Sequence, residues 1–191
     1  MVNKQTNVRK KVGLSAISAI GLMISLLQGM PSLAFADTGG DMAENTKPPL
    51  QITNQTDIKV VAQINYTDNT PKGISKQILA VKNLYDQYTK LGLKAGKDYD
   101  IVMVFRADGA QFLLTDEAYD KKVKKPHPKG NPNKAILEVL QKGGVKMYEC
   151  SVAMKIKGYE AKDIFPFARP VVSGMGALID FEKSGYLPIT P

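Results

Sequence analysis

The sequence predicts an α/β fold, a three-layer α/β/α sandwich built on a parallel five-stranded sheet. Two observations predict it. From residue 58 onward, short runs of β-branched and other apolar residues alternate with segments whose apolar residues recur at helical spacing. Glycine, proline or a helix-capping residue stands at most of the boundaries. Strands that alternate with helices form parallel sheets that helices cover on both faces.

Two segments precede this pattern. Residues 1–36 have the order of a secretory signal peptide: a basic start, an uncharged apolar run over residues 12–30, and the small-residue site Ala34-Phe35-Ala36. The apolar run is close to the length that spans a bilayer, so an uncleaved anchor is the alternative. We expect cleavage, a periplasmic or secreted protein, and no stable membrane insertion afterwards. The polar residues that follow, up to residue 57, predict a flexible leader.

The composition narrows the classes of site that the chain can hold. The signal segment carries four basic residues and no acid, which is half of the formal net charge of +8, so the remainder does not indicate a nucleic-acid partner. One cysteine and one histidine are too few for a Cys/His metal site. Gly174-Met175-Gly176 lacks the third glycine of a dinucleotide fingerprint, because Ile179 stands there. We therefore expect no metal and no cofactor.

The folded domain is expected over residues 58–191, and its first strand over residues 58–64, a run rich in valine and isoleucine. We expect the next helix to have Thr70 as its N-cap and Pro71 at its first position, and to end at Gly92. A second apolar run predicts a strand over residues 99–105.

Residues 106–130 interrupt the alternation, and we expect a long surface loop there. Lysine and proline are concentrated in this segment, at Lys121, Lys122, Lys124, Lys125, Pro126, Pro128 and Lys129. A solvated loop is the simplest interpretation, and a basic lid over an anionic ligand is the alternative.

The alternation resumes at Asn131-Pro132, which we expect to open a helix that Gly143-Gly144 closes. The remaining predicted elements are a strand at residues 145–149, a helix at 151–157 ended by Gly158, a strand at 170–172, a helix from Ser173 to Lys183, and a strand at 186–189 that Pro188 confines to a sheet edge.

Polar residues follow three of the predicted strands. Asn65 follows the first strand, Arg106 and Asp108 follow the second, and Cys150 and Ser151 follow the third. Open parallel sheets bind ligands outside the carboxyl ends of their strands. We therefore expect these residues to meet at one edge of the sheet and to form the site.

Cys150 is the candidate for chemistry. It stands at a predicted strand-to-helix turn, where a helix N-terminus stabilises a thiolate, and Lys155 lies one turn along. A lone core cysteine is equally often inert packing, so both interpretations stay open. A Cys–His dyad with His127 and an acid–base pair of Asp108 and Glu149 are further hypotheses that the spacing does not favour.

Several segments resemble the DsrE/DsrF-like family. Residues 144–155, a glycine-led strand that runs into a cysteine and then a short helix, resemble its signature segment. Residues 102–110, Asn131-Pro132 before a helix, and the chain end at residues 171–174 and 185–191 agree with it. The resemblance covers residues 58–191 and implies a parallel five-stranded α/β/α fold and homo-oligomers, often trimers or hexamers.

The resemblance also implies a function. It indicates a sulfur-relay protein, a sulfurtransferase-like carrier that accepts sulfane sulfur as a persulfide on Cys150. The better-known carriers of the family act in the cytoplasm, so the predicted export of this chain, which comes from its signal segment, departs from them. A donor or acceptor protein and a small sulfur anion such as thiosulfate would be its partners, with Asn65, Arg106 or Lys155 orienting the anion. The alternative is a non-catalytic, oligomeric small-ligand-binding module in which the cysteine is structural. A third hypothesis is redox sensing through a disulfide between subunits.

Overall fold

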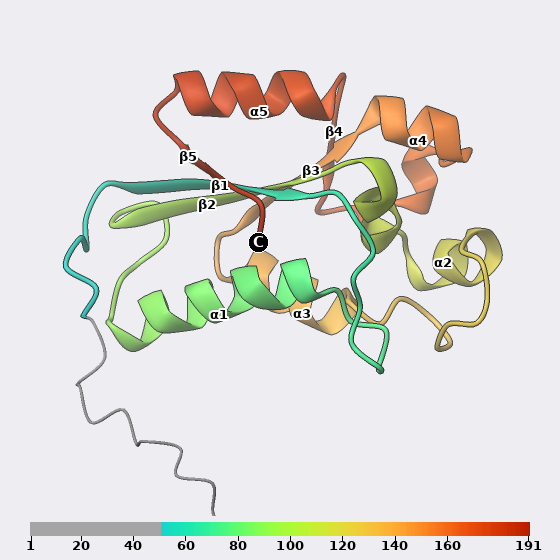
Figure 1. Ribbon diagram of the computed structural model, residues 1–191, viewed down its shortest axis with the longest axis horizontal. Coiled ribbons are helices and arrows are strands. Elements are labelled where there is room, and N and C mark those ends of the chain that lie inside the picture. Colours follow the sequence, from blue (N-terminus) through green and yellow to red (C-terminus); the bar gives the residue numbers. More distant parts are fainter. Residues whose placement is uncertain (1–50) are drawn as a thin grey trace, which may run out of the picture. The chain divides into compact units, whose positions relative to one another are not determined.

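The computed structural model describes residues 51–191 and contains a five-stranded sheet in which all neighbouring strands are parallel (Figure 1). The strand order is β4-β3-β2-β1-β5. The strands are β1 (Ile58–Ile64), β2 (Tyr99–Phe105), β3 (Lys146–Cys150), β4 (Arg169–Val171) and β5 (Leu187–Ile189). The predicted α/β/α sandwich and its parallel five-stranded sheet are confirmed.

Helices lie on both faces of the sheet (Figure 1). The helices α1 (Lys76–Lys90) and α3 (Lys134–Lys142) cover one face, over a core that includes Ile101, Met103 and Phe105. Within residues 51–191, α5 (Gly174–Lys183) is the helix that covers the other face, above Val61, Val102 and Val104, which are fully buried. The second face is therefore the more thinly covered of the two.

The strand boundaries follow the sequence closely. The first two strands have the predicted bounds, and β3 begins and ends one residue later than predicted, so that Cys150 is its last residue. Each edge strand contains a proline: Pro188 in β5 and Pro170 in β4. Proline lacks the N–H that an inner strand must donate, which fits these edge positions.

The predicted start of α1 is wrong. Ser75, not Thr70, is the N-cap, and its hydroxyl accepts a hydrogen bond from the backbone N–H of Ile78. The Thr70 hydroxyl instead accepts one from Ile74 N in a turn that precedes the helix. Ser75 is fixed from a distance, because its N–H donates to the buried Asn133 Oδ1 at 2.8 Å. Local capping residues could not reveal this tertiary contact.

The prediction of a long loop over residues 106–130 is also wrong. The segment contains a 3₁₀ helix, η1 (Ala107–Leu113), and the helix α2 (Asp116–Lys122). Thr115 caps α2 by accepting a hydrogen bond from Ala118 N, and two buried residues of the helix, Ala118 and Tyr119, join the core. The irregular part is confined to residues 123–130, where lysines 124, 125 and 129 are exposed.

Asn131 and Asn133 explain why the next helix begins slightly later than Asn131-Pro132 predicts. Asn133 is the N-cap of α3, and Asn131 is buried before it. The Asn131 side-chain amide donates to the backbone carbonyls of Phe112 and Leu114, and its oxygen accepts from Asn133 N. These two asparagines connect α3 to η1 through hydrogen bonds, so their role is structural.

Two further helical segments complete the fold: α4 (Ser151–Lys157), as predicted, and the 3₁₀ turn η2 (Ala161–Asp163). Residues 51–57 are exposed and have no regular structure. The predicted signal segment 1–36 lies outside the described residues, as does the leader up to residue 50. Within residues 51–191, no helix has the length and apolar character needed to cross a membrane.

Candidate functional site

Cys150 is the last residue of β3 and the N-cap of α4, at the carboxyl edge of the sheet (Figure 1). Its side chain packs against Ala110 of η1, Ala153 of α4 and Tyr159. Only 6% of the residue is exposed. A sulfur this enclosed admits a small reagent more readily than a bulky one.

A backbone N–H from α5 donates to the sulfur. Gly174 N, the first residue of α5, donates a hydrogen bond to Cys150 Sγ at 3.1 Å. Ser173 caps the same helix by accepting from Gly176 N. An N–H donor at the start of a helix stabilises negative charge on its acceptor, here an anionic sulfur.

Gly174 allows this approach because it has no side chain. A Cβ at residue 174 would lie 3.0 Å from Arg106 Cβ and 3.1 Å from Cys150 Cβ, distances at which the neighbours must move. The end of β2, the end of β3 and the start of α5 therefore meet at one point. The sequence places Gly174 in an incomplete nucleotide-binding motif and, with Ser173, after the fourth predicted strand, but it does not reveal this packing role.

Arg106 is the cation whose side chain packs, together with that of Cys150, against Gly174. Its Nη2 donates to the thioether sulfur of Met175 at 2.9 Å, and no carboxylate within residues 51–191 forms an ion pair with it. A thioether is a weak acceptor, so the guanidinium keeps its charge and donors for a stronger partner. Of the predicted ligand-binding residues, Arg106 is the one that the structure brings to Cys150 most clearly.

Glu149 lies next to the cysteine and is fully buried. Its Oε1 accepts a hydrogen bond from Cys150 N at 3.0 Å, whereas its Oε2 has no hydrogen-bond partner among the described residues. The pKa of the Glu149 carboxyl is raised to about 9, mainly by burial; the hydrogen bond from Cys150 N lowers this pKa and negative charge on Cys150 raises it. The carboxyl group is therefore neutral at pH 7.

Asn65 is occupied by a structural network. Its side-chain oxygen accepts from Gln77 Nε2 at 3.3 Å, and its backbone N–H donates to Gln77 Oε1 at 2.9 Å. The buried Gln77 also donates to the carbonyl of Gln63. The side chain of Asn65 thus has a structural role in the fold, which is an alternative to the predicted ligand-binding role.

The other predicted site residues are more exposed. Asp108 forms an ion pair with Lys157 of α4 at 2.8 Å. The lysine of α4 that pairs with this acid is therefore Lys157 and not the predicted site residue Lys155. Lys155 is exposed, and Ser151 is half-buried at the start of α4. Asp108 and Glu149 do not form the acid–base pair considered from the sequence, because each carboxyl group has a different partner.

The hypothesis of a Cys–His dyad is wrong. His127 lies on the 123–130 loop, where its Nε2 contacts the carbonyl of Val123 at 3.1 Å and its Nδ1 contacts that of Pro128 at 2.7 Å. The ring also packs edge-on against Tyr119 of α2. Both ring nitrogens are occupied locally, so the imidazole fastens the loop to α2.

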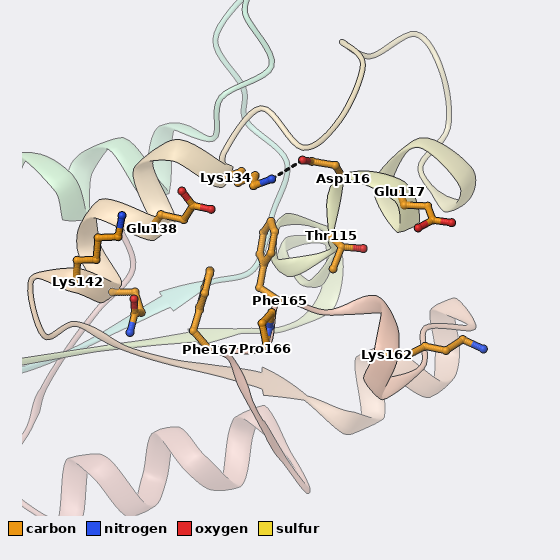
Figure 2. A pocket seen from close by; sticks show the side chains of 11 residues that line it. Thr115, Asp116, Glu117, Lys134, Glu138, Lys142, Lys162, Phe165, Pro166 and Phe167 are labelled. Atoms are coloured by element: carbon orange, nitrogen blue, oxygen red, sulfur yellow. Dashed lines mark hydrogen bonds and ion pairs between the residues drawn. The ribbon is translucent and has the colours of Figure 1, made fainter.

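A separate hollow of about 700 Å³ lies between α2, α3 and the segment after η2 (Figure 2). The rings of Phe165 and Phe167 stack in it with centroids 5.1 Å apart. Its charged lining is balanced, with Asp116, Glu117 and Glu138 against Lys134, Lys142 and Lys162, and Lys134 already pairs with Asp116 (Figure 2). Cys150 does not line this hollow, so we place the chemistry at the strand ends.

Comparison with known proteins agrees with the fold. A sequence model of the DsrE/DsrF-like family matches residues 56–191. The protein of unknown function MTH1491 from Methanobacterium thermoautotrophicum has a similar structure, with a TM-score of 0.53 and 19% identity over 71% of this chain and 100% of that chain. The ychN protein from E. coli matches with a TM-score of 0.47 and 14% identity over 70% of this chain and 97% of that chain. No curated protein matches the chain.

Proposed function

The chain belongs to the DsrE/DsrF-like family, a family of sulfur-relay type, and on this premise we propose that it is a sulfur carrier that accepts sulfane sulfur as a persulfide on Cys150. The observation that carries the proposal is the hydrogen bond from Gly174 N to Cys150 Sγ at the carboxyl edge of the sheet. A cysteine that served only as packing would not need a backbone donor aimed at its sulfur.

The chemistry balances with thiosulfate as the donor. The Cys150 thiolate attacks the sulfane sulfur, a new S–S bond forms at Cys150, and the S–S bond of thiosulfate breaks. Sulfite leaves with the electron pair of the broken bond, and the protein keeps the outer sulfur as an anion, Cys–S–S⁻. A thiol of an acceptor protein then removes that sulfur by the same kind of exchange.

Two groups beside Cys150 suit an anionic substrate and an anionic product. The N–H of Gly174 stabilises negative charge on the sulfur, and the Arg106 guanidinium attracts the donor anion. The low exposure of Cys150 favours a small donor over direct attack on a bulky one. Thiosulfate and short polysulfides meet both requirements.

Cyanolysis tests this proposal. The purified protein is incubated with thiosulfate or polysulfide, freed of excess reagent and treated with cyanide, which removes sulfane sulfur as thiocyanate. We expect one equivalent of thiocyanate per chain from the wild type and none from Cys150→Ser. Equal yields from both proteins would show that the sulfur is not held on Cys150.

We also propose that the protein forms a homo-oligomer, a trimer or hexamer as the family resemblance implies. Exposed apolar side chains on α4, α5 and the segment between β4 and α5 support this proposal. They are Val152, Ile156, Val172, Met175 and Ile179, which are between 50% and 88% exposed. Covering such side chains by a second copy removes apolar surface from water.

Export is the remaining part of the proposal, and it rests on the sequence of residues 1–36. A chain expressed with its own N-terminus and recovered from the periplasm or medium should begin at Asp37. An intact N-terminus in the membrane fraction would instead indicate an uncleaved anchor.

The second candidate function is the non-catalytic ligand-binding module. The hollow with the stacked Phe165 and Phe167 favours it, because stacked aromatic rings beside lysines can hold a small planar anion. This function predicts ligand binding that Cys150→Ser leaves unchanged. The buried position of Cys150 opposes the third hypothesis, a disulfide between subunits.

A further inference from the structure

Glu149 Oε2 is the one buried side-chain oxygen or nitrogen within residues 51–191 that has no hydrogen-bond partner. An unpartnered polar atom inside a protein is costly, and an unpaired buried carboxylate is more costly still. A neutral carboxylic acid reduces that cost. The position of this acid, immediately before Cys150 in β3, connects it with the sulfur site.

We propose that Glu149 is a positioning residue for Cys150. The neutral carboxylic acid of Glu149 holds the backbone of the cysteine and keeps negative charge away from the sulfur anion. Ionisation of Glu149 therefore opposes sulfur chemistry at Cys150. The part of this proposal that concerns sulfur acceptance rests on the proposed function. The part that concerns the reactivity of the thiol does not.

The geometry supports the positioning role. Glu149 Oε1 accepts from Cys150 N at 3.0 Å, and Gly174 N donates to Cys150 Sγ at 3.1 Å. The cysteine is thus held at its backbone by one group and at its sulfur by another. The acceptor oxygen works equally well in a carboxylic acid and in an amide, since both present a carbonyl oxygen.

Arg106, the cation that packs with Cys150 against Gly174, donates to Met175, and no ion pair among the described residues favours the ionised form of Glu149. The titratable group that acts on Glu149 is the Cys150 thiol, and Glu149 in turn acts on Tyr159, as do Tyr119 of α2 and Asp108 of η1. Burial raises the pKa of Tyr159 to about 12, so this phenol is neutral, and Asp108 already pairs with Lys157. No lysine, arginine or histidine in the described part of the chain forms an ion pair with Glu149.

The charge of Glu149 therefore depends on the charge of its neighbour. Negative charge on Cys150 raises the pKa of Glu149, so a thiolate or persulfide anion makes the acid keep its proton more tightly. By the same reciprocity, a Glu149 carboxylate makes an anion on Cys150 less stable. Below pH 9 the acid is neutral and leaves the sulfur site undisturbed, and above pH 9 its charge opposes the sulfur anion.

The variant Glu149→Gln separates this role from simple packing, because the amide keeps the carbonyl oxygen that accepts from Cys150 N and cannot ionise. Two rates are measured from about pH 7 to about pH 10.5: alkylation of Cys150 by the neutral reagent iodoacetamide, and sulfur uptake from thiosulfate. We expect equal rates in variant and wild type near pH 7. As the pH passes 9, the variant should reach its full alkylation rate at a lower pH than the wild type, by up to about one unit, since a like charge nearby shifts a titration by about that amount. Glu182→Gln on the exposed part of α5 is the matched control.

A ratio of variant to wild-type alkylation that stays constant across the pH range would overturn the proposal. If the wild type alkylates normally but takes up no sulfur at any pH, the proposed function fails and the alkylation ratio still decides the role of Glu149. Should Glu149→Gln fail to fold, infrared spectroscopy of the wild type decides instead. A buried carboxylic acid C=O band must be present at pH 7 and disappear above pH 9, and its absence at pH 7 would overturn the proposal.

Discussion

Gly174 is the position at which one added methyl group tests the geometry of the sulfur site. In Gly174→Ala, the new Cβ would lie 3.0 Å from Arg106 Cβ and 3.1 Å from Cys150 Cβ, so α5 or its neighbours must shift by a few tenths of an ångström. Gly176→Ala is the matched control on the same helix. Its Cβ would meet only the Ser173 side chain, at 3.7 Å and 3.9 Å, which is ordinary contact.

The two substitutions are expected to differ in stability and in chemistry. Overpacking of this kind costs about 1–3 kcal/mol, whereas alanine within a helix is neutral or stabilises it by up to about 1 kcal/mol. Moving Gly174 N away from the sulfur removes a hydrogen bond to a charged group, worth about 1.5–3 kcal/mol, or roughly a tenfold or greater loss in sulfur uptake.

Thermal unfolding and cyanolysable sulfur measure the two effects. We expect Gly174→Ala to unfold at a lower temperature than the wild type and to accept sulfur more slowly, while Gly176→Ala matches the wild type in both. If the two variants behave alike, the close contact between Gly174 and Cys150 does not shape the site and the reasoning is wrong.

Three other expectations follow from the same structure. Arg106→Gln should slow sulfur uptake from thiosulfate by about tenfold and leave uptake from a neutral trisulfide unchanged, because only the anion needs the guanidinium. Equal slowing with both donors would contradict the role of Arg106 in attracting the anion. Lys122→Met removes the 2.6 Å ion pair that lowers the pKa of Asp163, so the variant should lose about 1–2 kcal/mol of stability at pH 7. A lowered pKa contributes stability above the ordinary value of 3.8 that is lost as the pH falls. The difference in unfolding temperature should therefore shrink at lower pH to the part that comes from the bond of Lys122 to the Gly158 carbonyl, and a difference that does not change with pH would refute the assignment. Val172→Glu places a charge on a side chain that is 88% exposed, and light scattering should show smaller assemblies of intact fold; an unchanged mass would exclude this surface from the interface.

The fold was more predictable than the site. The β-branched runs of β1 and β2 and the stop at Gly158 are local signals, and the structure follows them. The start of α1 is set instead by the long-range bond between Ser75 and Asn133, which no local pattern reveals. The helix α2 was missed because the lysines and prolines around it suggested a loop, whereas two buried side chains anchor it.

In the site, too, local signals predicted some features and long-range contacts decide the others. The position of Cys150 at a strand end was predictable, because topology brings the carboxyl ends of parallel strands together. The same topology predicted Arg106 at this edge, but not the hydrogen bond from Gly174 N to the sulfur, since that donor comes from the start of α5. One signal for Glu149 was available: it stands two residues after the buried Met147, on the inward-facing side of β3. An acid at such an alternating position is unusual and could have been singled out.

The central claim is that Cys150 carries sulfur, and the mass of the intact protein tests it most directly. The mature wild type and Cys150→Ser are weighed before and after incubation with polysulfide or thiosulfate. The account predicts that the wild type gains whole sulfur atoms, that reductant reverses the gain, and that the variant gains nothing. No gain in a folded wild type whose Cys150 can be alkylated only after unfolding would show that the thiol is buried packing and contradict the account.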